Sequence, residues 1–309
     1  MVVNAFASSV TARNRVIVHR ALSRHHDVEV VETNRRGHAT RFAHDAARRR
    51  LDAVVAFGGD GTLNEVATGL AGSGTALAVL PGGSTNVFAR TIGLPNDPVL
   101  AVKAVVDALD TGALRTVGLG RVDDRYFCFH TGIGFDAAVV AAVERHAQMK
   151  RWAGHPLFVT AALRTWIRGR RSRQGFHLSV DAADDDATGP PDVPVSLFTV
   201  VLNTNPYTYL GNRALDLSPA AGLNRSLVAI SFTSLTARAL LGSLAGALRG
   251  GGVKPAGHLV VQTGVRHLCV EADEPFPYQV DGDHLGDTKR LDIGYEPDIL
   301  RLVVPPSTT

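Results

Sequence analysis

Residues 51–66 constrain the fold more than any other part of this chain. They begin with an apolar run, 53–57, whose length and composition predict a buried parallel strand. Four residues typical of a tight loop follow: Gly58, Gly59, Asp60 and Gly61. Thr62 then stands where it could cap a helix, and Glu65 lies three positions further on, which is a capping-box spacing. The segment therefore predicts a strand, a glycine loop and the N-terminus of a helix.

This order of elements presents backbone N–H groups and the positive end of a helix dipole to an anion. The same device recurs in the next segment, where 76–80 predicts a second buried strand, 81–86 a loop of small residues and 87–91 a helix. Two such loops about twenty residues apart suit the two ends of one nucleotide. No Gly-Lys-Ser/Thr follows either loop, so neither is a Walker A loop.

The two loops carry motifs that resemble the diacylglycerol kinase catalytic-domain family, which includes bacterial lipid kinases, diacylglycerol kinases and sphingosine kinases. The motifs are Gly-Gly-Asp-Gly-Thr-Leu-Asn-Glu-Val at 58–66 and Pro-Gly-Gly-Ser-Thr-Asn-Val-Phe-Ala-Arg at 81–90. The first motif alone also resembles NAD kinases, whereas the pair is more specific to lipid kinases. Two further segments, 131–137 and 277–285, match the family, so the resemblance extends over nearly the whole chain. The Gly-x-Gly in 131–137 is not read as a dinucleotide fingerprint, because no βαβ frame follows it.

The predicted elements divide the chain into two domains. Strands and helices alternate over 1–112, which predicts an open α/β sheet. Beyond residue 114 strands crowd together with few helices between them, which predicts an antiparallel β-sandwich. We therefore assign 1–113 to a nucleotide-binding domain, with 300–309 as a candidate completion, and 114–299 to a lipid-substrate domain. The resemblance implies an NAD kinase-like sheet in the first of these.

The resemblance implies ATP as phosphoryl donor, with Mg²⁺ carried by the ATP. The nucleotide-binding residues it implies are Asn4, Thr33, Gly58, Gly59, Asp60, Gly61, Thr62, Asn64, Glu65, Ser84, Thr85 and Asn86. A turn or helix cap is the alternative role of Thr33. Asp60, expected in an exposed loop, is also a catalytic candidate and a partner for the Mg²⁺.

The C-terminal motif supplies the other catalytic candidates, Asp281 and Asp283. The resemblance implies that Asp283, helped by Asp281, takes the proton from the lipid hydroxyl. Asp-Gly is also the strongest hairpin signal, so an ordinary hairpin turn is the alternative.

The chain departs from the family pattern at several positions. Val87 and Asp283 stand where Asp and Glu are usual, and Arg225 stands where an Asp of a structural Mg²⁺ loop would be. A guanidinium repels a cation, so we expect no structural metal site in the protein. We expect Arg225 to pair instead with Asp216, because the guanidinium fork binds a carboxylate bidentately.

The reaction implied by the resemblance is phosphorylation of a lipid hydroxyl in phospholipid biosynthesis, with diacylglycerol converted to phosphatidic acid. The alternatives are an NAD kinase and a non-catalytic lipid-binding regulator of the same fold. The partner expected is a lipid substrate at a membrane surface, with no nucleic acid; a homodimer is compatible with the sequence.

Composition and hydropathy agree with a cytoplasmic protein that is peripheral at the inner face of the membrane. Apolar residues make up 45% and charged residues 20% of the 309 residues, as in soluble globular proteins. No signal peptide is recognisable, and no apolar run approaches the ~20 residues of a membrane-spanning helix. The stretch 146–173 is rich in Arg with Trp at intervals, which fits either a helix on a membrane surface or one packed on a sheet.

Overall fold

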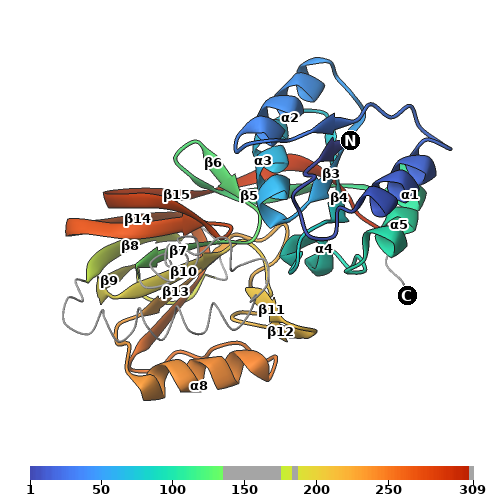
Figure 1. Ribbon diagram of the computed structural model, residues 1–309. Helices are drawn as coiled ribbons and strands as arrows, with labels where there is room; N and C mark the ends of the chain where they lie inside the picture. Colours follow the sequence, from blue (N-terminus) through green and yellow to red (C-terminus); the bar gives the residue numbers. More distant parts are fainter. Residues whose placement is uncertain (135–174, 183–186, 306–309) are drawn as a thin grey trace. The chain divides into compact units, whose positions relative to one another are not determined.

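The computed structural model describes residues 1–134, 175–182 and 187–305. It comprises two compact units, one formed by Met1–Leu119 with Pro297–Thr309 and the other by Gly120–Glu296 (Figure 1). The sequence-based boundary falls at the first residue of strand β5 (Leu114–Val122), and the boundary between the two units falls inside that strand. The predicted membrane-surface stretch 146–173 and the last three residues of the motif at 131–137 lie outside the described residues.

The first unit is built on a parallel sheet. Its strand order is β2 (Val31–Glu32), β1 (Val2–Val3), β3 (Ala53–Gly58), β4 (Ala76–Pro81) and the C-terminal part of β15 (Asp283–Val303). The ladders between them are parallel. All of β4 and all of β3 after its first residue are buried, because helices cover both faces of such a sheet. The two predicted buried strands are confirmed.

Five helices accompany these strands: α1 (Ala12–Leu22), α2 (His38–Arg48), α3 (Asp60–Leu70), α4 (Val87–Thr91) and α5 (Pro98–Asp110). Helix α2 packs on α3 and α1 packs on α5, and Figure 1 shows the two pairs on opposite sides of β3 and β4. The α2–α3 contact is close at Gly69. A Cβ there would lie 2.6 Å from both the Cβ of Ala43 and the carbonyl oxygen of Thr40.

The second unit is antiparallel. Its strands are β6 (Arg125–Phe127), β7 (His130–Gly134), β8 (Phe176–Ala182), β9 (Asp192–Ser196), β10 (Phe198–Leu202), β11 (Thr208–Leu210), β12 (Arg213–Leu215), β13 (Leu227–Phe232), β14 (Leu259–Val280) and most of β15. The ladders run β13–β10–β7–β14, and β14 also pairs with β13. One long strand therefore closes these four strands into a circuit, with one end on β13 and the other on β7.

Both faces of β10 and β13 are buried. Val201 and Ala229 belong to one apolar cluster, whereas Val200 and Ile230, their neighbours along each strand, belong to another. Helix α8 (Ala237–Leu248) contributes to the second cluster. An α/β unit followed by an antiparallel β unit confirms the predicted fold class.

One local prediction is wrong. Helix α3 begins at Asp60 with Gly59 as its N-cap, so Thr62 lies within the first turn and is not the cap. The reason is tertiary, because the Thr62 hydroxyl accepts a hydrogen bond from the side chain of Asn4 instead. The described helices include none long and apolar enough to cross a membrane.

The close α2–α3 contact generates a prediction. Ala in a helix interior is ordinarily more stable than Gly by about 1 kcal/mol, but Gly69→Ala forces a methyl group against α2 and should destabilise the protein by about 1–3 kcal/mol. Gly242, in the middle of α8, is the matched control, because a Cβ there meets nothing within 4 Å. Urea unfolding should show a loss for Gly69→Ala and a gain for Gly242→Ala; a gain for both would contradict the packing described.

Candidate functional site

The carboxyl ends of four parallel strands gather the predicted nucleotide-binding residues in the first unit. Asn4 follows β1, Thr33 follows β2, residues 59–61 follow β3 and residues 82–86 follow β4. Parallel strands end at a common edge, and ligands of open α/β sheets bind outside that edge. The structure thus brings these predicted residues to one edge of one sheet.

The two glycine loops touch each other along their backbones. The Gly82 N–H donates to the Gly58 carbonyl at 2.8 Å. A Cβ on Gly82 would lie 2.8 Å from the Cα of Gly58, and one on Gly83 would lie 2.9 Å from the Cα of Gly59. Side chains at 82 or 83 would therefore push the loops apart. Ser9, which the sequence did not single out, donates from its backbone N–H to the Gly82 carbonyl at 2.8 Å.

The Asp60 carboxylate joins the first loop to helix α4. It accepts from the backbone N–H groups of Val87 at 3.1 Å and Phe88 at 3.3 Å, the first turn of that helix. Burial raises the pKa of this carboxyl, and the two N–H bonds oppose the rise. The expectation of an exposed loop is wrong, because Asp60 is partly buried and its carboxylate bonds to α4.

Asn86 fixes the second loop from within. Its backbone is left-handed, with φ 51°. Its side-chain oxygen accepts from the Gly83 N–H at 2.8 Å, and its amide nitrogen donates to the Gly83 carbonyl at 2.8 Å and to Asn96 Oδ1 at 2.6 Å. Asn86 is buried, whereas Ser84 is exposed. Sequence reasoning missed Asn96, as it missed Ser9. The one signal that could have suggested Asn96 was its short separation from Asn86, ten residues along the chain.

Asn4, Thr62 and Gly58 form one cluster. The Asn4 amide donates to Thr62 Oγ1 at 3.0 Å, and its oxygen accepts from the Phe6 N–H at 3.1 Å. A Cβ on Gly58 would lie 2.6 Å from Thr62 Oγ1, so glycine at 58 leaves room for the hydroxyl that binds Asn4.

Glu65 caps a different helix from the one predicted. Its Oε1 accepts from the Gly37 N–H at 2.9 Å and its Oε2 from the Ala39 N–H at 3.0 Å, at the N-terminus of α2. The carboxylate therefore ties the loop that follows Thr33 to helix α3. Thr33 is buried, as is Asn64.

The N-terminus of α3 suits an anion. No side chain caps it, and a Cβ on Gly61 would meet nothing within 4 Å. The first N–H groups of the helix thus lie beside a loop, 58–61, in which Asp60 is the one residue that is not glycine. Helix N-termini beside glycine-rich loops bind phosphate. These features fit a nucleotide phosphate. Within the described ranges no three His, Cys, Asp or Glu side chains gather as a metal site would require.

In the second unit, Asp281 and Gly282 form the two-residue turn between β14 and β15, with φ 47° and 84°. The Asp281 carboxylate accepts from three successive backbone N–H groups, of Cys128 at 2.7 Å and of Phe129 and His130 at 3.0 Å each. The hairpin alternative therefore describes the backbone here, and the buried carboxylate anchors the turn to the start of β7. Its catalytic role stays a prediction.

Asp283 pairs with Arg125. The guanidinium nitrogen Nη2 lies 2.7 Å from Asp283 Oδ2, and both side chains are about a quarter exposed, at 25% and 23%. The Gly282 N–H donates to Gln279 Oε1 at 2.7 Å, which fixes the turn that carries Asp283. Sequence reasoning missed Arg125, because no local pattern links it to a residue 158 positions away.

His130 lies beside this turn with its ring among other aromatic rings. Its ring centroid is 4.3 Å from that of Tyr207 and 5.0 Å from that of Phe129. The Nδ1 atom is buried and has no hydrogen-bond partner among the residues that the structure describes. Burial lowers the pKa of the imidazole to about 3, so the ring is neutral at physiological pH.

The predicted pair of Arg225 and Asp216 is wrong. Asp216 Oδ1 accepts from the Asn205 amide at 3.1 Å, and Arg225 donates from Nη1 to the Ala220 carbonyl at 3.5 Å. Asn205 also accepts from the Leu217 N–H, so one amide side chain organises the loop and takes the carboxylate that Arg225 was expected to bind.

Comparison with known proteins gives relatives for both units. The family described as "Diacylglycerol kinase catalytic domain" matches residues 1–122. A diacylglycerol kinase of Bacillus subtilis is 41% identical over 100 residues, 32% of each chain, so the chain matches about a third of that relative's length. A probable lipid kinase, YegS-like, of Pseudomonas aeruginosa is 30% identical over 271 residues, 87% of this chain and 82% of the relative. A crystal structure of a putative diacylglycerol kinase from Bacillus anthracis has the same fold, with TM-score 0.76, 19% identity and coverage of 100% and 97%.

The Asp60 contacts generate the second prediction. Asn at this position can accept only one of the two α4 N–H bonds and turns its own NH₂ toward the other, so Asp60→Asn should lower the free energy of unfolding by about 1–3 kcal/mol. Asp52→Asn is the control, because Asp52 is an exposed residue just before β3, the strand that Asp60 follows. Equal stability of the two variants in urea would show that the Asp60 carboxylate does not hold α4.

His130 gives a pH-dependent prediction. Its folded pKa of about 3 lies below the unfolded value of about 6.5, so the unfolded chain takes up the proton first. The contribution of neutral His130 to the free energy of unfolding is therefore fully present above about pH 6.5. It falls as the pH drops toward 3, by up to about 1.4 kcal/mol per pH unit. We expect the free energy of unfolding in urea to depend less on pH between about pH 6 and 4 in His130→Phe than in the unchanged protein. His177→Phe, which changes an exposed histidine, should leave this pH dependence unchanged. Parallel curves for all three proteins would refute this.

Proposed function

The chain belongs to the family that carries the diacylglycerol kinase catalytic domain, and from this membership we propose that it is a lipid kinase. The proposed reaction transfers the terminal phosphoryl group of ATP to a lipid hydroxyl. Sequence identity over 271 residues, which includes most of the second unit, supports an activity that uses both units.

The observation that carries the proposal is the N-terminus of α3 at the carboxyl edge of the first sheet. It has no side-chain cap, and glycines stand at 58, 59 and 61 around it. The side chain of Asp60, the first helix residue, bonds to the N–H groups of Val87 and Phe88. Phosphoryl transfer depends on positioning and on stabilisation of charge, which N–H groups fixed in this way can provide. ATP bound there would be held by Gly59, Gly61, Thr62 and Ser84. Asn4 and Thr33 follow neighbouring strands at the same carboxyl edge of the sheet, where they would contact the nucleotide.

We assign Mg²⁺ to the ATP rather than to a site of the protein. Within 58–64 and 81–90, Asp60 is the single acidic residue. Val87, which stands where the family pattern has Asp, donates its N–H to the Asp60 carboxylate. Asp60 thus has a structural bond to α4 and is also the nearest candidate partner for the ion.

In the second unit we propose Asp283 as the acceptor of the hydroxyl proton. Its contact with Arg125 fixes the carboxylate, and its partial exposure leaves it open to a substrate. Asp281 is a positioning residue in this proposal, because three backbone N–H groups engage its carboxylate. General-base catalysis of this kind contributes about 10²–10⁴-fold to a rate.

Diacylglycerol is the acceptor we favour, with phosphatidic acid as the product. The relative from Bacillus subtilis bears the name diacylglycerol kinase, whereas other relatives bear the broader name of probable lipid kinase. A lipid acceptor implies that the protein works at a membrane surface, and we propose that it is peripheral at the inner face.

The test is transfer of radiolabel from ATP in the presence of Mg²⁺. Diacylglycerol, a sphingoid base, phosphatidylglycerol and NAD are supplied separately, and the product is separated by extraction into organic solvent. We expect label in the lipid phase with diacylglycerol, and none without Mg²⁺. Label on NAD alone would establish an NAD kinase, and no transfer to any acceptor would favour the non-catalytic lipid-binding alternative.

Paired variants serve as internal controls in the same assay. Asp283→Asn should lower kcat by about 10²–10⁴-fold, because it removes the proposed base. Asp287→Asn changes an exposed residue of the same strand and should leave kcat within about twofold. Equal rates for the two variants would remove Asp283 from the mechanism.

A further inference from the structure

Helix α8 has one buried side and one exposed side with two leucines. Ala239 and Ala247 are buried, and Ala247 belongs to the apolar cluster that includes β10 and β13. On the outside, Leu241 is 65% exposed and Leu244 is 41% exposed. Residues three apart are neighbours on a helix surface, so the two leucines form one apolar strip.

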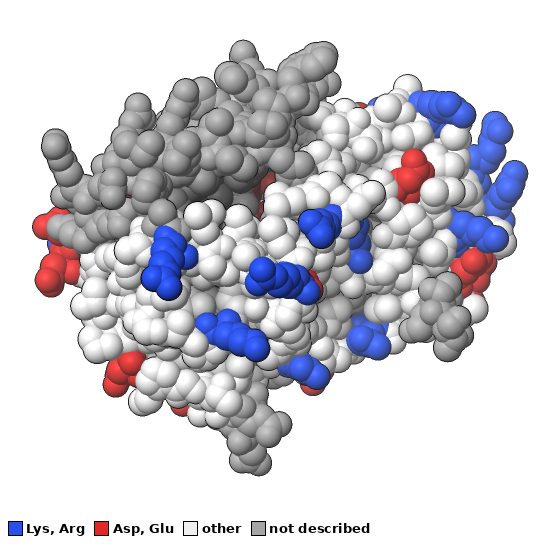
Figure 2. All heavy atoms as spheres, turned by 90° about the horizontal axis from the view of Figure 1, so that it is seen from below, with Lys and Arg blue, Asp and Glu red and all other residues white. Residues whose placement is uncertain are grey.

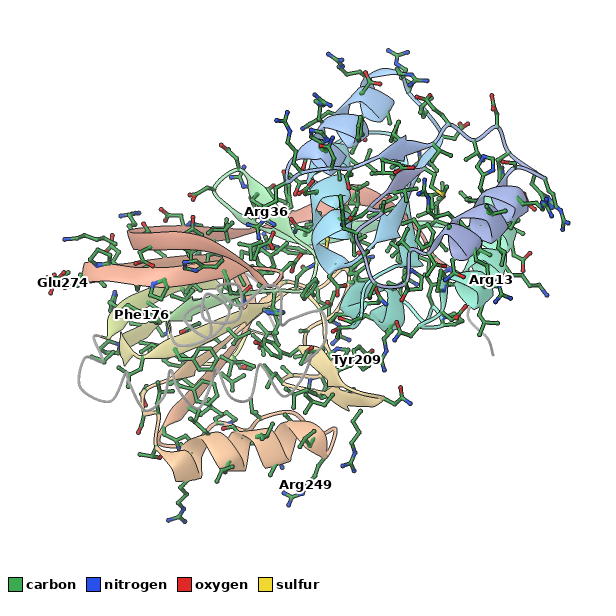
Figure 3. All side chains as sticks on the ribbon, in the orientation of Figure 1. Arg13, Arg36, Phe176, Tyr209, Arg249 and Glu274 are labelled. Atoms are coloured by element: carbon green, nitrogen blue, oxygen red, sulfur yellow. The ribbon has the colours of Figure 1, made fainter. Side chains whose placement is uncertain are left out.

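Basic residues lie at the two ends of this strip and in the segment that follows the helix. Arg238 and Arg249, near the two ends of α8, and Lys254 just beyond it are exposed. Figure 3 shows Arg249 at the C-terminal end of the helix, pointing away from the sheet. The sequence holds no Asp or Glu from 217 to 270. The preceding acidic residue, Asp216, is hydrogen-bonded to Asn205.

The hairpin β11–β12 lies beside this helix, since β12 packs against α8. Its turn exposes Leu210 and Arg213, another apolar and cationic pair. Leu210, Leu241 and Leu244 are three of the four large hydrophobic side chains exposed in the described part of the second unit. Figure 2, a view from the α8 side, shows Lys and Arg atoms spread over the second unit's surface, with few acidic atoms among them.

A single exposed leucine has no functional meaning. Leucines on the outer side of an amphipathic helix with basic residues around them have the chemistry of a surface that enters the headgroup region of an anionic bilayer. A second copy of the chain fits less well, because a two-fold contact through this strip would bring equal positive charges together. A stable interface would also need about 800 Å² from each partner, more than three side chains supply.

We propose that the outer face of α8 (Arg238, Leu241, Leu244, Arg249), with the turn of β11–β12, docks on an anionic lipid bilayer. The leucines enter the acyl boundary and the cations contact lipid phosphates. The inference deepens the proposed function and rests on it in one respect, since it names the surface that brings a lipid kinase to a membrane.

Vesicle co-sedimentation of the full chain, without ATP, tests the proposal. The vesicles are phosphatidylcholine alone, or phosphatidylcholine and phosphatidylglycerol in equal parts. We expect binding to the anionic vesicles that weakens as salt rises. Leu241→Gln with Leu244→Gln should lower vesicle affinity about tenfold or more. Replacing Arg238, Arg249 and Lys254 with Gln should lower vesicle affinity about fivefold for each charge removed.

The controls separate this surface from general effects. Leu100→Gln changes a leucine that is 66% exposed on α5 in the first unit, and Arg20, Arg24 and Arg48 changed to Gln remove the same net charge from exposed sites of that unit. Both controls should bind as the unchanged protein does. Equal losses in the controls, equal binding to neutral vesicles, or unchanged binding of the α8 variants would overturn the proposal. A lipid-free dimer that Leu241→Gln dissociates would assign the face to a second copy and also overturn it.

Turnover is measured separately, on a short-chain diacylglycerol dispersed without vesicles. Phosphorylation of this substrate by a chain whose vesicle binding is unchanged by the α8 substitutions would contradict the docking inference alone. A chain that docks through α8 but transfers no phosphate contradicts the proposed function alone.

Discussion

The arrangement of the first unit depends on the close backbone approach of two glycine loops. Gly82 hydrogen-bonds to Gly58 at 2.8 Å, and a Cβ on Gly82 or Gly83 would come within 3 Å of the facing loop. This contact brings the ends of β3 and β4 together, and with them the N-termini of α3 and α4. The anion site that we propose at this edge depends on glycines at these positions, because no side chain separates the loops there.

Carboxylates bound to backbone N–H groups fix the edges of both candidate sites. Asp60 holds the first turn of α4, Glu65 holds the first turn of α2, and Asp281 holds three N–H groups at the start of β7. Charge-assisted bonds of this kind are strong and fix both partners in place. The acidic residues most conspicuous in the sequence are therefore structural anchors, whatever chemistry they also perform. Asp283 also pairs with a side chain, the guanidinium of Arg125.

Much of the fold and the place of the site could be predicted because their signals are local. The apolar runs at 53–57 and 76–80 are strands, each followed by a glycine loop. Since parallel strands share a carboxyl edge, the predicted residues after them had to meet. Asp281-Gly282 forms the hairpin turn that this pair of residues favours.

The sequence by itself determined the alternation of strands and helices in the first unit, the two glycine loops and the turn at 281–282. Tertiary structure alone decided where side chains find their partners. Thr62 binds Asn4 and so does not cap its own helix, and Asp216 binds Asn205 rather than Arg225. The physical reason is that backbone conformation follows from neighbours along the chain, whereas a polar side chain bonds to whichever group the folded chain brings within reach. Those groups come from distant segments, so no local pattern contains them.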